Sequence, residues 1–273
     1  MSQNAQPVIA FIGAGNMAYS LVKGLLAGGH EASQIRVADP FEAALEKYAD
    51  TGVATFQDNN SAVEGADTAV LAVKPQVAGD VTRALDISSN QLLVSIAAGI
   101  ALDSLSSWTS EGQPIVRCMP NTPALLGAGM TALFANASCS DTHRQTAAYV
   151  LNAAGKTLWV EQEHDLDAVT AVSGSGPAYF FRLMEAMIEA GVGLGLSHAQ
   201  AKELTLQTAY GAALMASQTD DDPATLRENV TSPGGTTEAA LNVMADSGIG
   251  DIVNAALKAA NDRSKSLAEE FGK

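Results

Sequence analysis

Positive charge is scarce in this 273-residue chain, which has 15 Lys and Arg residues against 30 Asp and Glu residues. The formal net charge of −15 repels nucleic-acid phosphates and anionic lipid headgroups, so we expect neither nucleic acid nor a membrane as a partner. The same charge provides no long-range attraction for an anionic substrate. Any site for an anion must therefore be local.

Residues that commonly bind metals are also few. Cys118 and Cys139 form no CxxC pair, and the four histidines form neither HxxxH nor HExxH. We therefore expect no metal site and interpret the cysteines as free thiols in a reducing compartment. No stretch reaches the roughly 20 apolar residues of a membrane span, and the first residues lack the features of a signal peptide. These absences predict a cytoplasmic protein.

Aromatic residues make up only 5% of the chain, although hydrophobic residues together make up 47%. Alanine is used heavily, which favours helices that pack closely together. The charged fraction of 16% is typical of a globular chain rather than a disordered one. The length allows one large or two medium domains with a real core.

Short apolar runs alternate with helical segments through residues 1–163, which we assign to one α/β domain. Continuous apolar runs are typical of parallel strands that are covered on both faces. Strands alternating with helices predict a doubly wound sheet. The predicted strands are residues 8–12, 35–38, 68–73, 92–96, 115–118, 129–134 and 157–160.

The pattern changes to helices alone in residues 164–273, which we assign to a second, all-helical domain. Segments 177–194, 197–217 and 249–271 have helical periodicity, and Ser197 with Gln200 predicts a capping box at the start of the second one. That helix is apolar almost all round, which predicts burial against a second subunit. A self-contained bundle is the alternative.

A glycine-rich turn directly follows the first predicted strand. It reads Gly13-Ala14-Gly15-Asn16-Met17-Ala18, the GxGxxA pattern that opens a helix. The first glycine makes the turn, the second lets a pyrophosphate approach the backbone, and the small third residue lets helix and strand pack. The turn therefore predicts dinucleotide binding in the first domain. A tight turn without a ligand is the alternative.

An acidic residue, Asp39, stands at the end of the second predicted strand. A carboxylate there accepts hydrogen bonds from a ribose 2′-hydroxyl and repels a 2′-phosphate. Arg36 lies too early in the strand to offset it. This segment favours NAD or tolerance of both cofactors; the alternative is that Asp39 only caps the helix after Pro40.

Two later strand ends also reach the edge where such sheets bind cofactors. Lys74, held extended before Pro75, could contact a phosphate or the ring edge, or could simply be solvated. The small residues Ala97 and Ala98 would let a nicotinamide lie close.

A second glycine-rich loop lies far along the chain, in Ser232-Pro233-Gly234-Gly235-Thr236-Thr237. Backbone N–H groups and hydroxyls at a helix start can hold a small anion. The alternative is a capped helix start, in which Thr236 or Thr237 only satisfies its own backbone.

Five segments in the same order resemble the pyrroline-5-carboxylate reductase family. They are residues 12–17, 72–75, 117–123, 172–179 and 229–237, and the last is the most specific. The resemblance implies a Rossmann domain with a helical dimerisation domain, and dimers that assemble into larger rings such as a decamer. It implies reduction of 1-pyrroline-5-carboxylate to L-proline with hydride from NAD(P)H, the last step of proline biosynthesis.

The resemblance also assigns site residues. The cofactor would contact Gly13, Ala14, Gly15, Asn16, Met17, Asn59, Ala72, Val73, Lys74, Pro75 and, from the helical domain, Asn229; the strand-end arguments above add Asp39, Ala97 and Ala98. The substrate would contact Pro120, Asn121, Ser232, Gly234, Gly235, Thr236 and Thr237.

Thr237 is our candidate to hydrogen-bond the ring nitrogen, because no histidine lies in these segments and their one cysteine, Cys118, lies within a predicted strand. The loop N–H groups with the Ser232 and Thr236 hydroxyls would hold the substrate carboxylate. Asp39 departs from the family, most of whose members prefer NADPH and carry serine, threonine or arginine there. We therefore expect NADPH, with NADH possible because of Asp39.

Two other classes fit parts of the pattern. A β-hydroxyacid dehydrogenase shares the two-domain layout but is marked by a lysine on the helix after its glycine motif. Here the segment from Gly174 has no lysine before Lys202. A non-catalytic dinucleotide sensor would need the first glycine turn but not the loop at 232–237, and would bind the cofactor without turnover.

Overall fold

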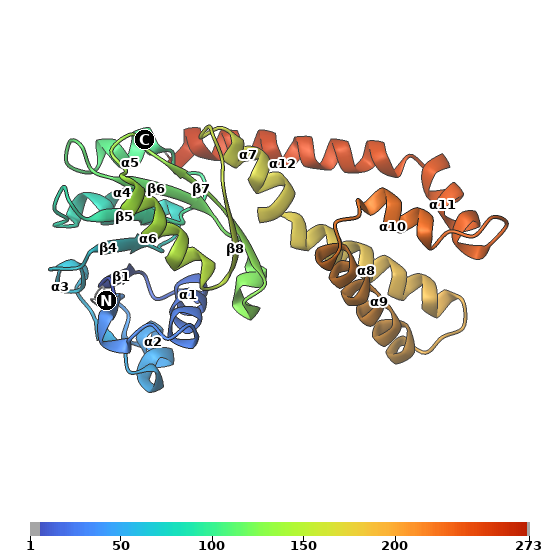
Figure 1. The fold of residues 1–273 in the computed structure, drawn as a ribbon, viewed down its shortest axis with the longest axis horizontal. Coiled ribbons are helices and arrows are strands. Elements are labelled where there is room, and N and C mark those ends of the chain that lie inside the picture. The colour runs from blue at the N-terminus through green and yellow to red at the C-terminus, as the bar shows by residue number, and fades with distance from the viewer. Residues whose placement is uncertain (1–5, 272–273) are drawn as a thin grey trace. The chain divides into compact units, whose positions relative to one another are not determined.

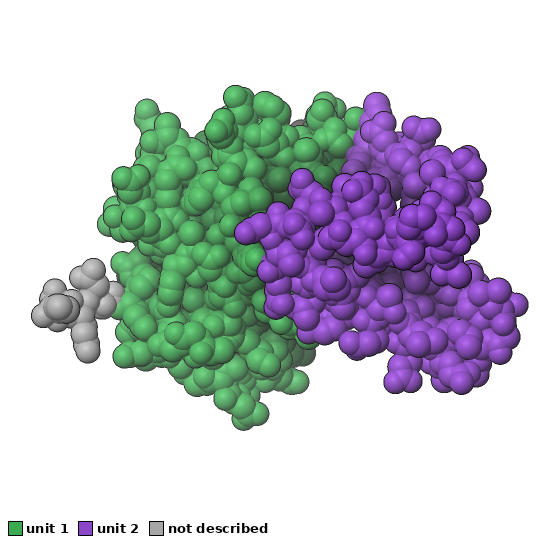
Figure 2. All heavy atoms as spheres, turned by 45° about the vertical axis from the view of Figure 1, so that its right-hand side comes forward, with its two compact units in different colours: residues 1–175, 260–273 green, residues 176–259 purple. Residues whose placement is uncertain are grey.

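The computed structural model of the chain describes residues 6–271 and divides into two compact units. One unit comprises residues 1–175 with 260–273, and the other comprises residues 176–259 (Figure 2). The boundary expected between residues 163 and 164 falls inside the first unit, which also takes in the end of the last helix. Residues 164–175 thus pack with the sheet rather than with the helical unit.

Within residues 6–271, the first unit contains one sheet of eight strands in the order β3-β2-β1-β4-β5-β6-β7-β8. The strands are β1 (Ile9–Ile12), β2 (Ile35–Ala38), β3 (Ala54–Phe56), β4 (Thr68–Leu71), β5 (Leu92–Ser95), β6 (Ile115–Met119), β7 (Gly129–Ala135) and β8 (Gly155–Trp159). The first six strands have the order of a doubly wound dinucleotide-binding sheet. The predicted fold class is confirmed.

The sheet differs from the sequence prediction at two places. Strand β3 was not predicted, because it is short, lies at the sheet edge and is largely exposed, so it has no apolar run. Strand β7 runs antiparallel to β6, although parallel strands were expected throughout. Residues 120–128 hold only the short 3-10 helix Thr122–Leu126, and a parallel crossover needs a dozen residues or more.

Helices cover both faces of the sheet (Figure 1), and successive strand residues alternate between two core clusters. Ile9 and Phe11 pack in the cluster that includes residues of α1 (Asn16–Ala27) and α6 (Asp141–Asn152). Ala10 and Ile12 pack in the other, beneath α3 (Asn59–Val63), α4 (Pro75–Ala84) and α5 (Leu102–Ser107). Burial on both faces explains why β1 is apolar at every position.

The second unit is helical. It contains α8 (Gly176–Gly193), α9 (His198–Gln218), α10 (Pro223–Asn229), α11 (Thr236–Asp246) and the first part of α12 (Ile249–Phe271). The predicted capping box is confirmed at the start of α9, where Ser197 N–H donates to Gln200 Oε1 at 3.0 Å and Gln200 N–H donates to Ser197 Oγ at 3.3 Å.

Large apolar side chains remain exposed on these helices, including Phe180, Leu204, Tyr210 and Met215. Only two residues of α9, Ala201 and Thr205, are buried. The chain alone therefore leaves apolar helix faces uncovered. Among residues 6–271, no helix combines the length and hydropathy that a membrane crossing requires.

Candidate functional site

The carboxyl ends of the parallel strands β1, β2, β4 and β5 meet at one edge of the sheet and bring together segments far apart in the sequence. Gly13 N–H donates to Ala38 O at 2.8 Å, Ala72 N–H donates to Ile12 O at 2.8 Å, and Ile96 N–H donates to Leu71 O at 3.1 Å. These bonds place four predicted cofactor segments side by side: the glycine turn, Asp39, residues 72–75 and residues 97–98. Such an edge is where doubly wound sheets bind dinucleotides.

The glycine turn is built for close approach. Gly13 has φ +100°, and a Cβ atom there would lie 2.7 Å from Ala72 O, so glycine is required. Gly15 and Asn16 are exposed, and α1 begins with neither a side-chain cap nor an acidic residue in its first turn. Its first backbone N–H groups therefore suit a pyrophosphate.

Asp39 holds the glycine turn rather than a helix. Its Oδ2 accepts from Ala14 N–H at 2.9 Å, and its Oδ1 accepts from Phe41 N–H at 3.0 Å. Helix α2 (Glu42–Leu45) begins after Phe41 without a side-chain cap. Carboxylate oxygens accept more than one hydrogen bond each, so Asp39 retains capacity for a ribose hydroxyl.

Three residues beside Asp39 were missed by the sequence analysis: Lys47, Tyr48 and Tyr19. Tyr48 is buried against Tyr19, with ring centroids 5.2 Å apart, and the Lys47 ammonium stands over both rings. Burial lowers the pKa of Lys47, whereas the charge of Asp39 raises it. Burial also raises the pKa of Tyr48, with Tyr19 and Asp39 adding to the effect. No motif carries these residues, because only tertiary packing brings them to Asp39.

The remaining cofactor candidates of the first unit lie at or next to the same edge. Lys74 is exposed and extended before Pro75, the first residue of α4, as predicted. Ala97 is buried and Ala98 is exposed after β5. Asn59 is half-buried at the start of α3, after β3. Val73 and Met17 are also half-buried.

Asn121 is already bonded within the first unit. Its Nδ2 donates to the carbonyl oxygen and to Oγ of Ser173, both at 3.2 Å, and its Oδ1 accepts from Met130 N–H at 2.9 Å. Ser173 belongs to a π-helix, Thr170–Gly174, of a kind that often marks functional sites. Asn121 therefore ties the end of β6 to this π-helix. Its neighbour Pro120 is half-buried.

A partly buried ion pair lies behind this edge. Arg117 Nη1 lies 2.7 Å from Glu163 Oε1, and the same oxygen accepts from Leu102 N–H at 2.7 Å. Glu163 thereby links β6 to the loop that follows Ala98. The sequence analysis did not find this link because its partners are 46 and 61 residues from Glu163.

In the second unit, the loop at 232–237 has the geometry of an anion loop with two N–H groups already bonded, since Gly235 N–H donates to Ser232 O at 3.0 Å. Gly234 has φ +71°, and its N–H donates to Glu238 Oε2 at 2.7 Å. Gly235 is the N-cap of α11 without a side-chain cap. Thr237 is half-buried, and within residues 6–271 its hydroxyl makes no hydrogen bond.

Because Gly235 is the N-cap of α11 and no side chain caps this helix, neither Thr236 nor Thr237 acts as its cap. Ser232 and Thr236 are exposed, as is Asn229 at the end of α10. Glu238 was missed, although its place three residues after the N-cap matches the glutamate position of a capping box.

A sheet of this order with an uncapped glycine turn and an acidic residue after β2 defines a Rossmann-type, dinucleotide-binding protein. The family model described as pyrroline-5-carboxylate reductase dimerisation matches residues 163–267. A second, described as NADP oxidoreductase coenzyme F420-dependent, matches residues 8–99.

Relatives match over nearly the full length. The pyrroline-5-carboxylate reductase of Pseudomonas aeruginosa is 52% identical over 269 residues, which cover 97% of this chain and 98% of the relative. That of Pasteurella multocida is 45% identical over 270 residues, which cover 96% and 98%.

Solved structures agree. A pyrroline-5-carboxylate reductase from Coxiella burnetii matches with TM-score 0.91 at 39% identity, over 96% of this chain and 98% of that one. The Plasmodium falciparum enzyme, solved with NADP bound, matches with TM-score 0.84 at 30% identity, over 97% and 99%.

The chain belongs to the pyrroline-5-carboxylate reductase family. It reduces 1-pyrroline-5-carboxylate to L-proline with NAD(P)H, the last step of proline biosynthesis, and carries the family's dimerisation domain.

Proposed function

We propose that residues at the sheet edge bind the cofactor in this reaction, whereas residues in the loop at 232–237 bind the substrate. The reduced nicotinamide supplies hydride to C2 of the pyrroline ring, the imine carbon that becomes C5 of proline, and the ring nitrogen gains a proton. An imine is partly protonated in water, so the protein need not provide a strong acid. Most of the rate then comes from holding the reacting atoms in position.

Thr237 is proposed to hydrogen-bond the ring nitrogen and to relay its proton. The main support for this role is that Thr237 is half-buried at the start of α11 and that its hydroxyl makes no hydrogen bond in the described chain. A hydroxyl can both donate and accept a hydrogen bond, so an unpaired hydroxyl at a helix start is available to a ligand.

The substrate carboxylate is proposed to bind the backbone N–H groups at the start of α11 with the Ser232 and Thr236 hydroxyls. An uncapped helix start favours an anion. Because Gly234 N–H is bonded to Glu238 and Gly235 N–H to Ser232 O, the substrate would use the N–H groups of Thr236 and Thr237 or displace the Glu238 carboxylate.

The cofactor is proposed to contact the residues that the sequence predicts, including Asn229 in the helical unit. Pro120 is proposed to contact the substrate directly. Asn121 is proposed to act mainly by positioning the π-helix, because both ends of its amide are engaged. The position of Asp39 supports use of NADH beside NADPH, since its carboxylate is fixed at the end of β2.

We further propose a homodimer that assembles into a larger ring such as a decamer, and a cytoplasmic location. The exposed apolar faces of α8 and α9 support self-association. The domain boundary between residues 163 and 164 stays our proposal for the dimerisation domain; the family model that starts at residue 163 supports it.

The decisive test is oxidation of NADH and of NADPH by the purified chain with 1-pyrroline-5-carboxylate. Proline must form in step with cofactor oxidation. Cofactor binding without turnover would instead support the sensor, and turnover of a β-hydroxyacid alone would support the dehydrogenase.

A further inference from the structure

A cation and two aromatic rings form a cluster beside Asp39 that no sequence motif contains. Lys47 and Tyr48 come from the 3-10 helix Glu46–Thr51, and Tyr19 comes from α1. The Lys47 ammonium lies 5.6 Å from the centroid of the Tyr19 ring and 5.7 Å from that of Tyr48. The two rings meet edge to face at 85°. Contact with both rings restricts where the ammonium can stand.

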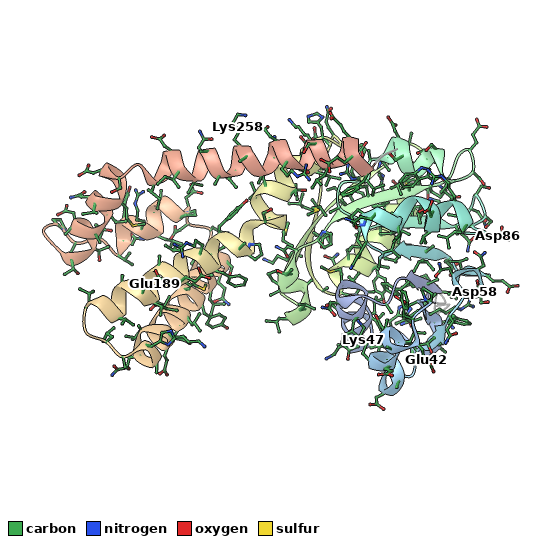
Figure 3. All side chains as sticks on the ribbon, turned by 180° about the vertical axis from the view of Figure 1, so that it is seen from behind. Glu42, Lys47, Asp58, Asp86, Glu189 and Lys258 are labelled. Atoms are coloured by element: carbon green, nitrogen blue, oxygen red, sulfur yellow. The ribbon has the colours of Figure 1, made fainter. Side chains whose placement is uncertain are left out.

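The cluster is electrically coupled to Asp39. The charge of Asp39 acts on both Lys47 and Tyr48, while burial disfavours the charged form of each. Lys47 is half-buried, and the buried Tyr48 hydroxyl has no hydrogen-bond partner within residues 6–271. The other ionisable side chains of this segment, Glu42, Glu46 and Asp50, are exposed (Glu42 and Lys47 are labelled in Figure 3).

Asp39 itself cannot turn away, because its two oxygens accept from Ala14 and Phe41. A fixed carboxylate at this place repels a 2′-phosphate. A chain that accepts NADPH therefore needs a cation near Asp39. Arg36 does not serve, since its Nη1 donates to the carbonyl oxygens of Ala62 and Glu64. Lys47 is the cation that the structure couples to Asp39.

We propose that Lys47 is a second determinant of cofactor choice, binding the 2′-phosphate of NADPH and neutralising Asp39 when NADH is bound. The proposal rests on the proposed role of Asp39 at the adenosine ribose. It does not rest on Thr237 or the substrate loop.

Nucleotide binding without substrate tests it. Calorimetric titration of the full-length protein with 2′,5′-ADP and with 5′-AMP isolates the contribution of the 2′-phosphate. Lys47→Met should weaken the affinity for 2′,5′-ADP by roughly 10–100-fold and change the affinity for 5′-AMP by no more than about twofold. The reason is that only 2′,5′-ADP loses a charge-assisted hydrogen bond. Lys47→Arg should retain most of the affinity for 2′,5′-ADP.

Lys23→Met is the matched control, because Lys23 also stands over the Tyr19 ring, at 5.7 Å, but is exposed. It should leave both affinities unchanged. Equal weakening of both nucleotides by Lys47→Met would show a structural role and overturn the proposal. An unchanged affinity for 2′,5′-ADP would overturn it as well.

Turnover with 1-pyrroline-5-carboxylate is measured separately on the same variants. Lys47→Met should raise the KM for NADPH and leave the KM for NADH nearly unchanged. Loss of kcat with both cofactors would contradict the assignment. Failure of the unaltered chain to turn over would count against the proposed catalytic residues and not against Lys47.

Discussion

The carboxylate of Asp39 accepts a hydrogen bond of 2.9 Å from the backbone N–H of Ala14, inside the glycine turn. The residue that would read the adenosine ribose thus also stabilises the turn that would hold the pyrophosphate. Changes at Asp39 are therefore expected to affect cofactor choice and, more weakly, cofactor affinity in general.

Replacing Asp39 with serine should move cofactor preference towards NADPH. Serine keeps an acceptor for Ala14 but removes the charge that repels a 2′-phosphate. We expect the ratio of kcat/KM for NADPH to that for NADH to rise by about tenfold or more, the scale of one charged hydrogen bond. Asp58→Ser removes a neighbouring surface charge, at the cap of α3, and should leave the ratio unchanged. An unchanged ratio in Asp39→Ser would leave Asp39 with a structural role only.

Replacing Thr237 with alanine should lower kcat by about 10–1000-fold, the range for one group that positions or transfers a proton. The melting temperature should not change, because the hydroxyl bonds to nothing in the described chain. Thr237→Ser keeps the hydroxyl and should keep most of the activity. Normal steady-state kinetics in Thr237→Ala would remove this residue from the mechanism.

Replacing Arg117 with methionine should destabilise the first unit. Glu163 would lose its cation while it still accepts from Leu102 N–H. We expect the free energy of unfolding to fall by about 2–4 kcal/mol, since one charge of a mostly buried pair is left alone. The comparison is Arg83→Met, which breaks an exposed pair with Asp80 and should cost under about 1 kcal/mol. Denaturant titration measures both, and equal losses would show that the Arg117 pair contributes no more than a surface pair.

Stability should decrease in mild acid because of His30. This side chain is buried beside Tyr149, and burial lowers its pKa from 6.5, against smaller raising effects of Pro7 and Glu31. The unfolded chain then binds a proton at higher pH than the folded chain does. The contribution of His30 to the stability of the folded chain is therefore complete above pH 6.5, and it declines as the pH falls towards the pKa of His30 in the folded chain.

Melting temperatures from pH 7.5 to 5.5 measure this effect. His30→Gln should reduce the dependence of melting temperature on pH, whatever it does to the melting temperature itself. His164→Gln changes an exposed histidine and should leave this pH dependence unaltered. A slope that survives in His30→Gln would assign it to another group.

Charges placed on α9 should separate the subunits. Leu204 and Tyr210 are 57% and 63% exposed in the single chain, which is unusual for apolar side chains on one helix. The double variant Leu204→Lys and Tyr210→Lys should reduce the mass measured by light scattering to that of one chain. Lys202→Gln, a change of charge on the same helix, should leave the mass unaltered. An unchanged mass in the double variant would place the interface elsewhere.

Local patterns were sufficient for much of this protein. Strand β1, buried on both faces, is apolar at each position, the GxGxxA turn requires glycine at position 13, and the capping box joins Ser197 to Gln200, three positions later. Each depends on neighbours in the chain, so sequence alone determined the strands other than β3, the dinucleotide turn and the helical second part.

Tertiary structure decided what depends on distant residues. The antiparallel β7 follows from a short connection, but the bonds of Asn121 to Ser173 and of Arg117 to Glu163 join residues 52 and 46 positions apart. The meeting of Asp39 with Ala14 and Lys47 requires β2, α1 and the following 3-10 helix to pack together. Sequence thus determined which residues could serve a dinucleotide and an imine, and packing decided which of their polar groups are still free to do so.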